Sequence, residues 1–536
     1  MLMLAPAALA QPNVVVFMTD DQTVRQVQYM PNVQRLIAEQ GTSFTRFFAT
    51  FPLCCPSRAT MLTGQYAHNH GVLHNAGPFG GYKRLDHANT LPVWLKLAGY
   101  RTLQVGRWLN GYGTDNANQA EIPPGFDEWF APVGTSAQLY QGQTINENGM
   151  LRFFTEYQTD LYADKAIELI RESQSPFFLH LTFSAPHRGR PDDPDDPPTI
   201  GTPSPAPRHR DAFAHLNLPV PPNFDEVDVR DKPQDVFERP RLSLDTVAAI
   251  RENWQQELES LLSVDEAIGQ VIGELEREGR LDDTLIVFVS DNGFMHGEHR
   301  LPVEKVWPYD ESARVPLILR GPGVPRGAKL DQLSANIDVV PTILDAAGAS
   351  ATLTMDGRSL FGLMEDPTLE WGRDILLQSG FGANGVGGYS AIRNYGFLYV
   401  QWKHSGEYEL YDLRRDPWAM RNLDGRLAYE KEQAELARRL RTLRGCWGAS
   451  CSRPPALTLT GGRRCTPSLQ VIRLTGRELD KVGHVDFYGG RKRLGRDRRA
   501  PFELELRRAR PVRVRAVLRY GRVVTLDRRV RAAPCP

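Results

Sequence analysis

The chain has 536 residues, of which 41% are hydrophobic and 24% charged, a composition that is typical of globular proteins and excludes an intrinsically disordered chain. Its length allows a large hydrophobic core and at least one further domain. The formal net charge of zero does not indicate a nucleic-acid partner, although residues 446–536 hold 22 Lys and Arg against 7 Asp and Glu.

The first ten residues indicate export. They form an apolar run that ends in Ala8-Leu9-Ala10, which is typical of an Ala-x-Ala signal-peptide cleavage site. The run is short and lacks a basic region, so we interpret residues 1–10 as a signal-peptide remnant; a disordered tail is the alternative. No other apolar run approaches the roughly 20 residues that cross a bilayer. We therefore expect a secreted or extracytoplasmic protein without an integral membrane segment.

Residues 14–18 are a continuous apolar run, Val-Val-Val-Phe-Met, which predicts a fully buried parallel strand. Thr19, Asp20 and Asp21 follow it. Two adjacent carboxylates at a strand end repel each other, so they are tolerated where they cap a helix, face solvent or bind a cation. The pattern by itself leaves these three interpretations open.

Residues 53–64 contain a turn that leads into a predicted helix, with Cys54 just upstream of the helix N-terminus. Backbone N–H groups and the positive end of the helix dipole favour a phosphate or sulfate at such a position. Arg58 adds a planar charge that can orient the reacting residue. The alternative is that Cys54 and Cys55 are a buried pair ahead of an ordinary helix, since free cysteine often packs as a small hydrophobe.

Two further strand ends carry polar residues that can act on an anion. After a predicted helix at residues 91–100, the strand 102–105 leads to Arg107, which can bind an oxyanion through two N–H groups. The apolar run 177–183 predicts another strand and leads to His187, a side chain that can supply a proton near neutral pH. The following segment, residues 188–240, is rich in Pro and Asp, which is typical of a site rim or a disordered insertion.

A second acidic strand end lies far along the chain. Residues 258–275 have helical apolar spacing and predict a helix. The run 285–289 predicts another buried strand, which ends at Asp291 and Asn292. Asp-Asn-Gly alone favours a turn, but ligands gather at the carboxyl ends of parallel strands. Lys305 follows this region, and a lone lysine is normally solvated.

Four of the six cysteines lie after residue 445. In an exported chain they indicate two disulfides, most simply Cys446–Cys451 and Cys465–Cys535, although three pairings are possible. Zinc binding is the alternative, but the four cysteines lack a close Cys-x-x-Cys pair and nearby histidines.

The same C-terminal part alternates in period two. Residues 469–474 and 512–518 show this alternation between glycine turns, which predicts a small antiparallel sandwich. Its many arginines either attract a polyanionic substrate or only line a solvated surface.

The stretch Cys54-Cys55-Pro56-Ser57-Arg58 resembles the Cys-x-Pro-Ser-Arg signature of the type I, formylglycine-dependent sulfatases. The acidic pairs at the two buried strand ends match the metal-binding pairs of that family, and the resemblance extends from about residue 12 to residue 443.

Within the family, residues 106–110, Gly-Arg-Trp-Leu-Asn, are most similar to the Gly-Lys-Tyr-Leu-Asn form of the N-acetylglucosamine-6-sulfatase-like branch. Many sulfatases have Gly-Lys-Trp-His here, so that Arg107 takes the place of a lysine and Leu109 that of a histidine. The departure leaves a role for Asn110 in doubt.

The resemblance implies that a separate formylglycine-generating enzyme oxidises Cys54 to formylglycine (3-oxoalanine), and that the formylglycine hydrate attacks sulfur. It also implies one Ca²⁺ ion, for which an all-oxygen shell is suited. The metal ligands that it implies are Asp20, Asp21, Asp291, Asn292 and the modified Cys54. The catalytic residues that it implies are Cys54, Arg58, Arg107, His187 and Lys305.

We therefore expect an α/β protein with an alkaline-phosphatase-like, mostly parallel sheet flanked by helices, a small C-terminal α+β subdomain and an appended all-β domain. The expected boundaries are 11–370 for the sulfatase catalytic domain, 371–445 for the subdomain and 446–536 for a basic, disulfide-linked β-sandwich.

The expected activity is hydrolysis of sulfate monoesters, of a sulfated sugar or polysaccharide, by a sulfuric ester hydrolase. Two alternatives stay open at this point. The same scaffold supports phosphate or phosphonate monoester hydrolysis, and a chain whose Cys54 is never oxidised would be a non-catalytic binder of sulfated glycans.

Overall fold

The computed structural model describes residues 11–116, 118–194, 196–369, 371–380, 382, 386–451, 457–465, 468–476, 482–489, 492–498, 502–506, 511–518 and 523–529. The signal-peptide remnant predicted at residues 1–10 lies outside these ranges. So does Cys535, and with it the predicted Cys465–Cys535 disulfide. Within the described ranges, no helix combines the length and the apolar character needed to cross a membrane.

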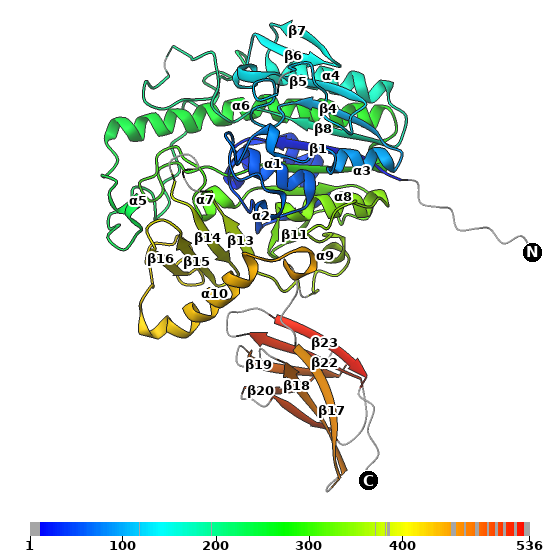
Figure 1. Ribbon diagram of the computed structural model, residues 1–536, viewed down its shortest axis with the longest axis vertical. Helices are drawn as coiled ribbons and strands as arrows, with labels where there is room; N and C mark the ends of the chain where they lie inside the picture. The colour runs from blue at the N-terminus through cyan, green and yellow to red at the C-terminus, as the bar shows by residue number, and fades with distance from the viewer. Residues whose placement is uncertain are drawn as a thin grey trace, which may run out of the picture.

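A ten-stranded sheet forms the centre of the molecule (Figure 1). Its middle five strands, β9, β1, β8, β4 and β5, are parallel, and antiparallel pairing joins them to the outer strands on each side. This is the mostly parallel sheet that the sequence predicts. In spatial order the strands are β11 (Ala328–Leu330), β2 (Thr42–Phe44), β10 (Leu317–Arg320), β9 (Thr284–Ser290), β1 (Asn13–Thr19), β8 (Phe177–Thr182), β4 (Arg101–Gly106), β5 (Glu128–Pro132), β6 (Gln143–Glu147) and β7 (Met150–Phe154).

Helices cover both faces of this sheet, which explains why its central strands are near-continuous apolar runs. Along β1, Val14, Val16 and Met18 pack into the core on one face, and Val15 and Phe17 pack into the core on the other. The first core includes α1 (Cys54–Thr63), α3 (Leu91–Leu97) and α8 (Val339–Ala347), and the second includes η1 (Val24–Tyr29), η2 (Val33–Ala38), α4 (Gln158–Glu172) and α6 (Leu244–Arg277).

The helix α6 is longer than the sequence pattern predicts. It begins at Leu244, where the Ser243 hydroxyl accepts a hydrogen bond from Thr246 N at 3.1 Å, and not near residue 258. Its first half buries Ile250 and Trp254 against side chains of the Pro- and Asp-rich segment 188–240. This burial stabilises the first half of the helix. The sequence pattern did not predict it, because the apolar side chains are covered by an irregular loop.

The register of the central strands places four strand ends at one edge of the sheet. Thr19 of β1 pairs with Ser290 of β9, and Gly106 of β4 pairs with Thr182 of β8. The side chains that follow these ends are Asp20, Asp21, Asp291, Asn292, Arg107 and, after the turn beyond β8, His187.

A four-stranded antiparallel sheet with one helix packs beside this core (Figure 1). Leu436 and Leu440 of the helix lie in a single core with Ile392 and Leu398 of the sheet, as expected of a small α+β unit. Its elements are β13 (Ile375–Gln378), β14 (Tyr389–Arg393), β15 (Phe397–Trp402), β16 (Tyr408–Asp412) and α10 (Glu430–Leu443). Shorter elements of the chain before β13 are β3 (Phe47–Phe48), α2 (Ala67–His70), α5 (Gln234–Phe237), α7 (Asp310–Ala313), β12 (Ser334–Ala335) and α9 (Phe361–Glu365).

Strands after residue 456 form two further antiparallel sheets at one end of the molecule (Figure 1), in agreement with the predicted all-β tail. One contains β17 (Leu457–Cys465), β18 (Ser468–Gly476) and β21 (Glu503–Leu506); the other contains β20 (Lys492–Asp497), β19 (Val482–Gly489), β22 (Pro511–Leu518) and β23 (Val523–Arg529). The boundaries expected at residues 370 and 445 fall between α9 and β13 and just after α10, and the division into domains stays a prediction.

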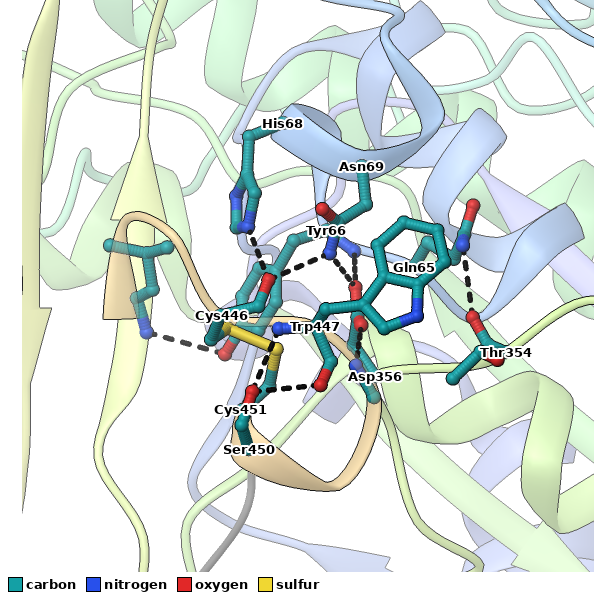
Figure 2. The surroundings of a disulfide bond; sticks show 12 residues. Gln65, Tyr66, His68, Asn69, Thr354, Asp356, Cys446, Trp447, Ser450 and Cys451 are labelled. Atoms are coloured by element: carbon teal, nitrogen blue, oxygen red, sulfur yellow. Dashed lines mark hydrogen bonds between the residues drawn. A yellow bond between two sulfur atoms is a disulfide. The ribbon is translucent and has the colours of Figure 1, made fainter. Parts of the chain in front are cut away.

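The predicted Cys446–Cys451 disulfide is present, with the two Cα atoms 5.0 Å apart (Figure 2). The short loop that it closes lies against the turn between α1 and α2. Asp356 joins the two, and it accepts three hydrogen bonds, from Tyr66 N (2.8 Å), Asn69 Nδ2 (2.7 Å) and Gly448 N (2.7 Å). The end of α10 is thereby fixed to the segment that follows α1.

Candidate functional site

The first turn of α1 presents Cys54 at the edge where the central strands end. Leu53 precedes the helix and makes no side-chain cap, while the positive end of the helix dipole favours an anion beside Cys54. The Cys54 Sγ atom lies 2.9 Å from Lys305 Nζ and 3.7 Å from Asp20 Oδ1. Cys54 is therefore buried among charged side chains and not in an apolar core.

Three carboxylates and one amide from two strand ends face one another beside it. Asp20, Asp21 and Asp291 each contribute an oxygen, and these three atoms lie within 4.8 Å of one another. Asn292 Nδ2 donates a hydrogen bond to Asp21 Oδ1 at 2.6 Å. The two pairs are far apart in sequence, and they meet because β1 and β9 are neighbouring parallel strands.

This donor set fits a hard divalent cation. All four side chains offer oxygen atoms, which Ca²⁺ prefers to softer ligands. Asn292 Oδ1 is buried and accepts no hydrogen bond from the described part of the chain. Burial, together with repulsion from Asp20, raises the pKa of Asp291 to about 6 and also raises that of Asp21. A cation at this position would relieve both effects.

Two arginines surround the acidic cluster. Arg58 binds Asp20 Oδ2 through Nη2 at 2.7 Å and Asp291 Oδ2 through Nε at 2.9 Å, and its Nη1 donates to two backbone carbonyls. Arg107 Nη1 lies 3.1 Å from Asp20 Oδ2. Although burial opposes it, the guanidinium groups of Arg107 and Arg58 hold the pKa of Asp20 well below its ordinary value. Asp20 is thus a permanent carboxylate.

Lys305 and His187 complete the group of predicted residues. Lys305 Nζ lies 2.5 Å from Asp21 Oδ1, and burial disfavours its charge, but Asp21 and the other anionic groups still raise its pKa. His187 Nε2 lies 3.9 Å from Asp21 Oδ2, while its Nδ1 donates to the Arg188 carbonyl at 2.7 Å. Burial and Arg107 lower the pKa of His187 well below its ordinary value, so this ring is neutral and must accept a proton before it can supply one.

The charges of the site are balanced without a ligand. Three carboxylates face three cationic side chains, so a divalent cation would leave a net positive site that attracts an anionic ester. Burial and the nearby Asp20 raise the pKa of the Cys54 thiol to about 12. The unmodified thiol is therefore protonated at neutral pH, which disfavours direct attack by a thiolate.

Two residues that hold the site escaped the sequence analysis. Asn75 Oδ1 accepts a hydrogen bond from Cys55 N at 2.9 Å, at the first turn of α1. Asn336 Nδ2 donates to Ser57 Oγ at 2.9 Å, and Ser57 Oγ donates in turn to the Asp291 carbonyl. Both asparagines lie outside the long elements and follow no periodic pattern, so only the folded chain brings them to α1.

Two histidines of the segment after α1 stabilise the fold, whereas the two residues in question after Arg107 divide between the core and a cavity. His68 Nε2 bonds to the Cys446 carbonyl and His70 Nε2 to Thr60 Oγ1, so both histidines stabilise the fold. Leu109 packs in the core. Asn110, whose buried Oδ1 has no partner among the described residues, lines a cavity of about 190 Å³ next to Arg107.

Comparisons with known proteins agree with this geometry. Residues 12–349 match the Sulfatase family, and residues 297–445 match the family described as N-sulphoglucosamine sulphohydrolase, C-terminal. The chain is 33% identical to an arylsulfatase of Volvox carteri, over 84% of this chain and 77% of the relative.

The chain is also 33% identical to the N-acetylglucosamine-6-sulfatase of Homo sapiens, over 69% of this chain and 68% of the relative. A solved structure of a protein in complex with its substrate D-glucosamine-2-N,6-O-disulfate has a TM-score of 0.68 and 27% identity, over 80% of this chain and 97% of that chain. The chain therefore belongs to the sulfatase family and is a sulfuric ester hydrolase.

Proposed function

We propose that the chain removes the 6-O-sulfate of a sulfated amino sugar, free or within a saccharide, with Cys54 in its formylglycine form and one bound Ca²⁺. The observation that carries the proposal is the meeting of Cys54 with three carboxylates, the Asn292 amide and three cationic side chains at one edge of the sheet. The glucosamine disulfate bound by the structural neighbour and the named activity of the human relative support the choice of sugar.

The Ca²⁺ ion and the formylglycine at position 54 would lie among residues with suitable chemistry. Asp20, Asp21, Asp291 and Asn292 would hold the cation together with the modified residue 54. Formylglycine would supply a geminal diol as nucleophile, and Ca²⁺ would supply Lewis-acid polarisation at the site.

The side chains of this protein position and neutralise the ester. Arg107 and Lys305 present N–H groups toward the space beside Cys54, where they can bind sulfate oxygens and stabilise the charge that develops as the S–O bond breaks. Arg58 is held by two carboxylates and two carbonyls, so its role is to fix α1 and the acidic cluster relative to each other. His187 Nε2 can accept a proton at the site and return it to the leaving oxygen.

Maturation and location follow from the same proposal. Oxidation of Cys54 requires a formylglycine-generating enzyme as a partner before or during folding, because Cys54 is 1% exposed in the folded chain. Relatives named as extracellular sulfatases and the apolar N-terminus support export of the mature protein.

The test compares esters on protein produced together with a formylglycine-generating enzyme. The tryptic peptide that contains Cys54 is weighed first, so that the converted fraction is known. Turnover is then measured for N-acetylglucosamine 6-sulfate, N-acetylglucosamine 6-phosphate, a small aryl sulfate and a phosphonate monoester, before and after chelation and with Ca²⁺ restored.

We expect kcat/KM to be highest for the 6-sulfated sugar and to need the divalent cation. A preference for the phosphate or phosphonate ester would favour the phosphoester hydrolase alternative. Unmodified Cys54 in the exported native protein would favour the glycan-binding alternative. Full activity in protein shown by elemental analysis to be metal-free would contradict the cation site.

A further inference from the structure

A second cavity lies beside the catalytic site and shares none of the residues described for it. Its volume is about 310 Å³. Thr23, two residues after Asp21, and Phe294, two residues after Asn292, form part of its wall. The rest of the wall comes from η1, the segment between β2 and β3, residues 218–219, α6, the loop that contains His296 and Glu298, α7 with the residue after it, the end of β14 with the turn that follows, and the loop after β16. The cavity therefore lies between the α/β core and the four-stranded sheet.

The wall of this cavity holds four arginines and three carboxylates, Glu298, Asp310 and Glu311, and the charge of Arg46 acts on Asp310. Two of the arginines nevertheless form no ion pair with any described residue. Arg25 lies over the ring of Trp418, 5.3 Å from its centroid, and Arg46 lies over the ring of Tyr395 at 5.1 Å. Neither guanidinium forms an ion pair within the described part of the chain. The two other arginines of the wall differ, because both pair with Asp310, Arg393 at 2.9 Å and Arg314 at 3.7 Å.

Two buried polar atoms of the same wall have no partner. The hydroxyl of Thr23 and the indole Nε1 of Trp254 make no hydrogen bond to any residue that the structure describes. Thr23 is 7% and Trp254 is 2% exposed, and a buried polar group without a partner is costly and uncommon. The cavity therefore offers one donor and one hydroxyl to a ligand, in addition to the two cationic groups.

We propose that this cavity binds an acidic sugar unit, a pyranose that carries a sulfate or a carboxylate, at a second saccharide site of the enzyme. A guanidinium matches the planar or tetrahedral oxygens of either anion, and Thr23 and Trp254 match the hydroxyls of a sugar ring. The aromatic side chains of the wall supply the apolar surface on which such a ring packs. The sugar class rests on the proposed function, whereas the anionic character of the ligand rests on the excess of arginines over carboxylates in the wall, where Arg25 and Arg46 are the guanidinium groups that form no ion pair within the described residues.

The experiment measures binding without turnover, on the full chain with Cys54→Ala. Isothermal titration calorimetry uses size-defined heparin hexasaccharides that are native, fully desulfated, carboxyl-reduced, or both desulfated and carboxyl-reduced. R25Q/R46Q is compared with R35Q/R326Q, which also removes two positive charges, from exposed arginines that do not line the cavity. We expect at least about a tenfold loss of affinity for the native hexasaccharide in R25Q/R46Q and less than a twofold loss in the control.

The desulfated and carboxyl-reduced probes show which anion is recognised, and dependence on Arg25 and Arg46 for either one supports the site. Equal affinity of R25Q/R46Q and R35Q/R326Q for all acidic probes would overturn it, as would equally tight binding of the neutral probe. If R25Q/R46Q does not fold, as judged by its melting temperature, Trp418→Leu replaces it with the same expected loss. A wild-type enzyme that releases no sulfate from any ester would refute the proposed function and leave this binding result unchanged.

Discussion

The two ends of α1 contrast in how their polar groups are satisfied. At the N-terminal end, three buried carboxylates lie within 4.8 Å of one another and Asn292 Oδ1 has no partner among the described residues. Beyond the C-terminal end, Asp356 accepts three hydrogen bonds and the Cys446–Cys451 disulfide closes the adjoining loop (Figure 2). The helix α1 thus connects a site that a bound cation would stabilise to a segment whose polar groups are satisfied by the chain itself.

The difference shows how the fold can tolerate its catalytic site. Crowded buried carboxylates destabilise a folded chain unless something compensates. The compensation at the far end is structural, since its hydrogen bonds and its disulfide hold the segment after α1 in place. Substitutions at the two ends should therefore separate activity from stability.

The largest effect is expected at Cys54. Cys54→Ala removes the nucleophile, so kcat should fall by at least about 10³-fold, while the melting temperature changes little because, among the described residues, the hydrogen bonds of Sγ are those to Lys305 and Asp20. Initial rates on a sulfate ester and a thermal melt check both expectations. Cys55→Ala is the matched control: Cys55 is a buried free thiol of the same turn, and its loss should leave most of the activity.

A smaller loss of activity is expected at Arg107. Arg107→Gln removes a cationic donor next to Asp20 and should lower kcat/KM by about 10²- to 10³-fold. Arg107→Lys keeps the charge, so we expect it to stay within about tenfold of the wild type. Equal losses in both variants would mean that the forked geometry of the guanidinium, and not its charge, binds the ester.

Much of the fold and of the site follows from the sequence, for a physical reason. A strand buried on both faces must be apolar throughout, so the runs that end at Asp20 and Asp291 are visible without a structure. Parallel pairing then brings the two ends together. Asn75 and Asn336 could not be found this way, because nothing in a loop sequence tells which helix it will contact. The start of α6 was missed for the same reason, since the side chains that pack on it belong to an irregular loop.

Substitution beyond the C-terminal end of α1 should lower the stability of the protein and leave its activity unchanged. Asp356→Asn replaces an acceptor of three hydrogen bonds by a group that is itself partly a donor, which should cost about 2–4 kcal/mol in free energy of unfolding. The melting temperature measures this, and kcat on a sulfate ester should be unchanged below the melt. A parallel fall in kcat at temperatures where the variant is fully folded would show that the two ends are coupled.

The Cys446–Cys451 disulfide should contribute somewhat less than Asp356 to the free energy of unfolding. The loop between Cys446 and Cys451 is short, so its closure restricts the unfolded chain by about 2 kcal/mol, and Cys446→Ser with Cys451→Ser should lower the melting temperature accordingly. Reducing agent should destabilise the wild type by a similar amount and the double variant not at all. A wild-type protein that melts identically with and without reductant would contradict a stabilising role for this bond.

The smallest effect concerns pH and the buried His180, which lies beneath the catalytic end. Its Nδ1 donates to Gln104 Oε1 at 2.7 Å, and burial, together with Arg58, lowers its pKa to about 3. An unfolded histidine titrates near 6.5, so between these two values the unfolded chain binds more protons than the folded one. Stability supplied by the neutral ring is then complete above about pH 6.5 and is lost as the pH falls toward 3, by up to about 1.4 kcal/mol per pH unit.

This dependence can be isolated by comparing His180→Gln with His404→Gln, a substitution of an exposed histidine. Melting temperatures are recorded from pH 7.5 to pH 5 with Ca²⁺ in excess, so that the acidic cluster is equally occupied in all proteins. The wild type and His404→Gln should lose stability in parallel as the pH falls, whereas the gap between the wild type and His180→Gln should shrink by about 1 kcal/mol between pH 6.5 and pH 5.5. A constant gap would mean that His180 takes up a proton as readily as a solvated ring, and that the catalytic end of α1 is better hydrated than its burial indicates.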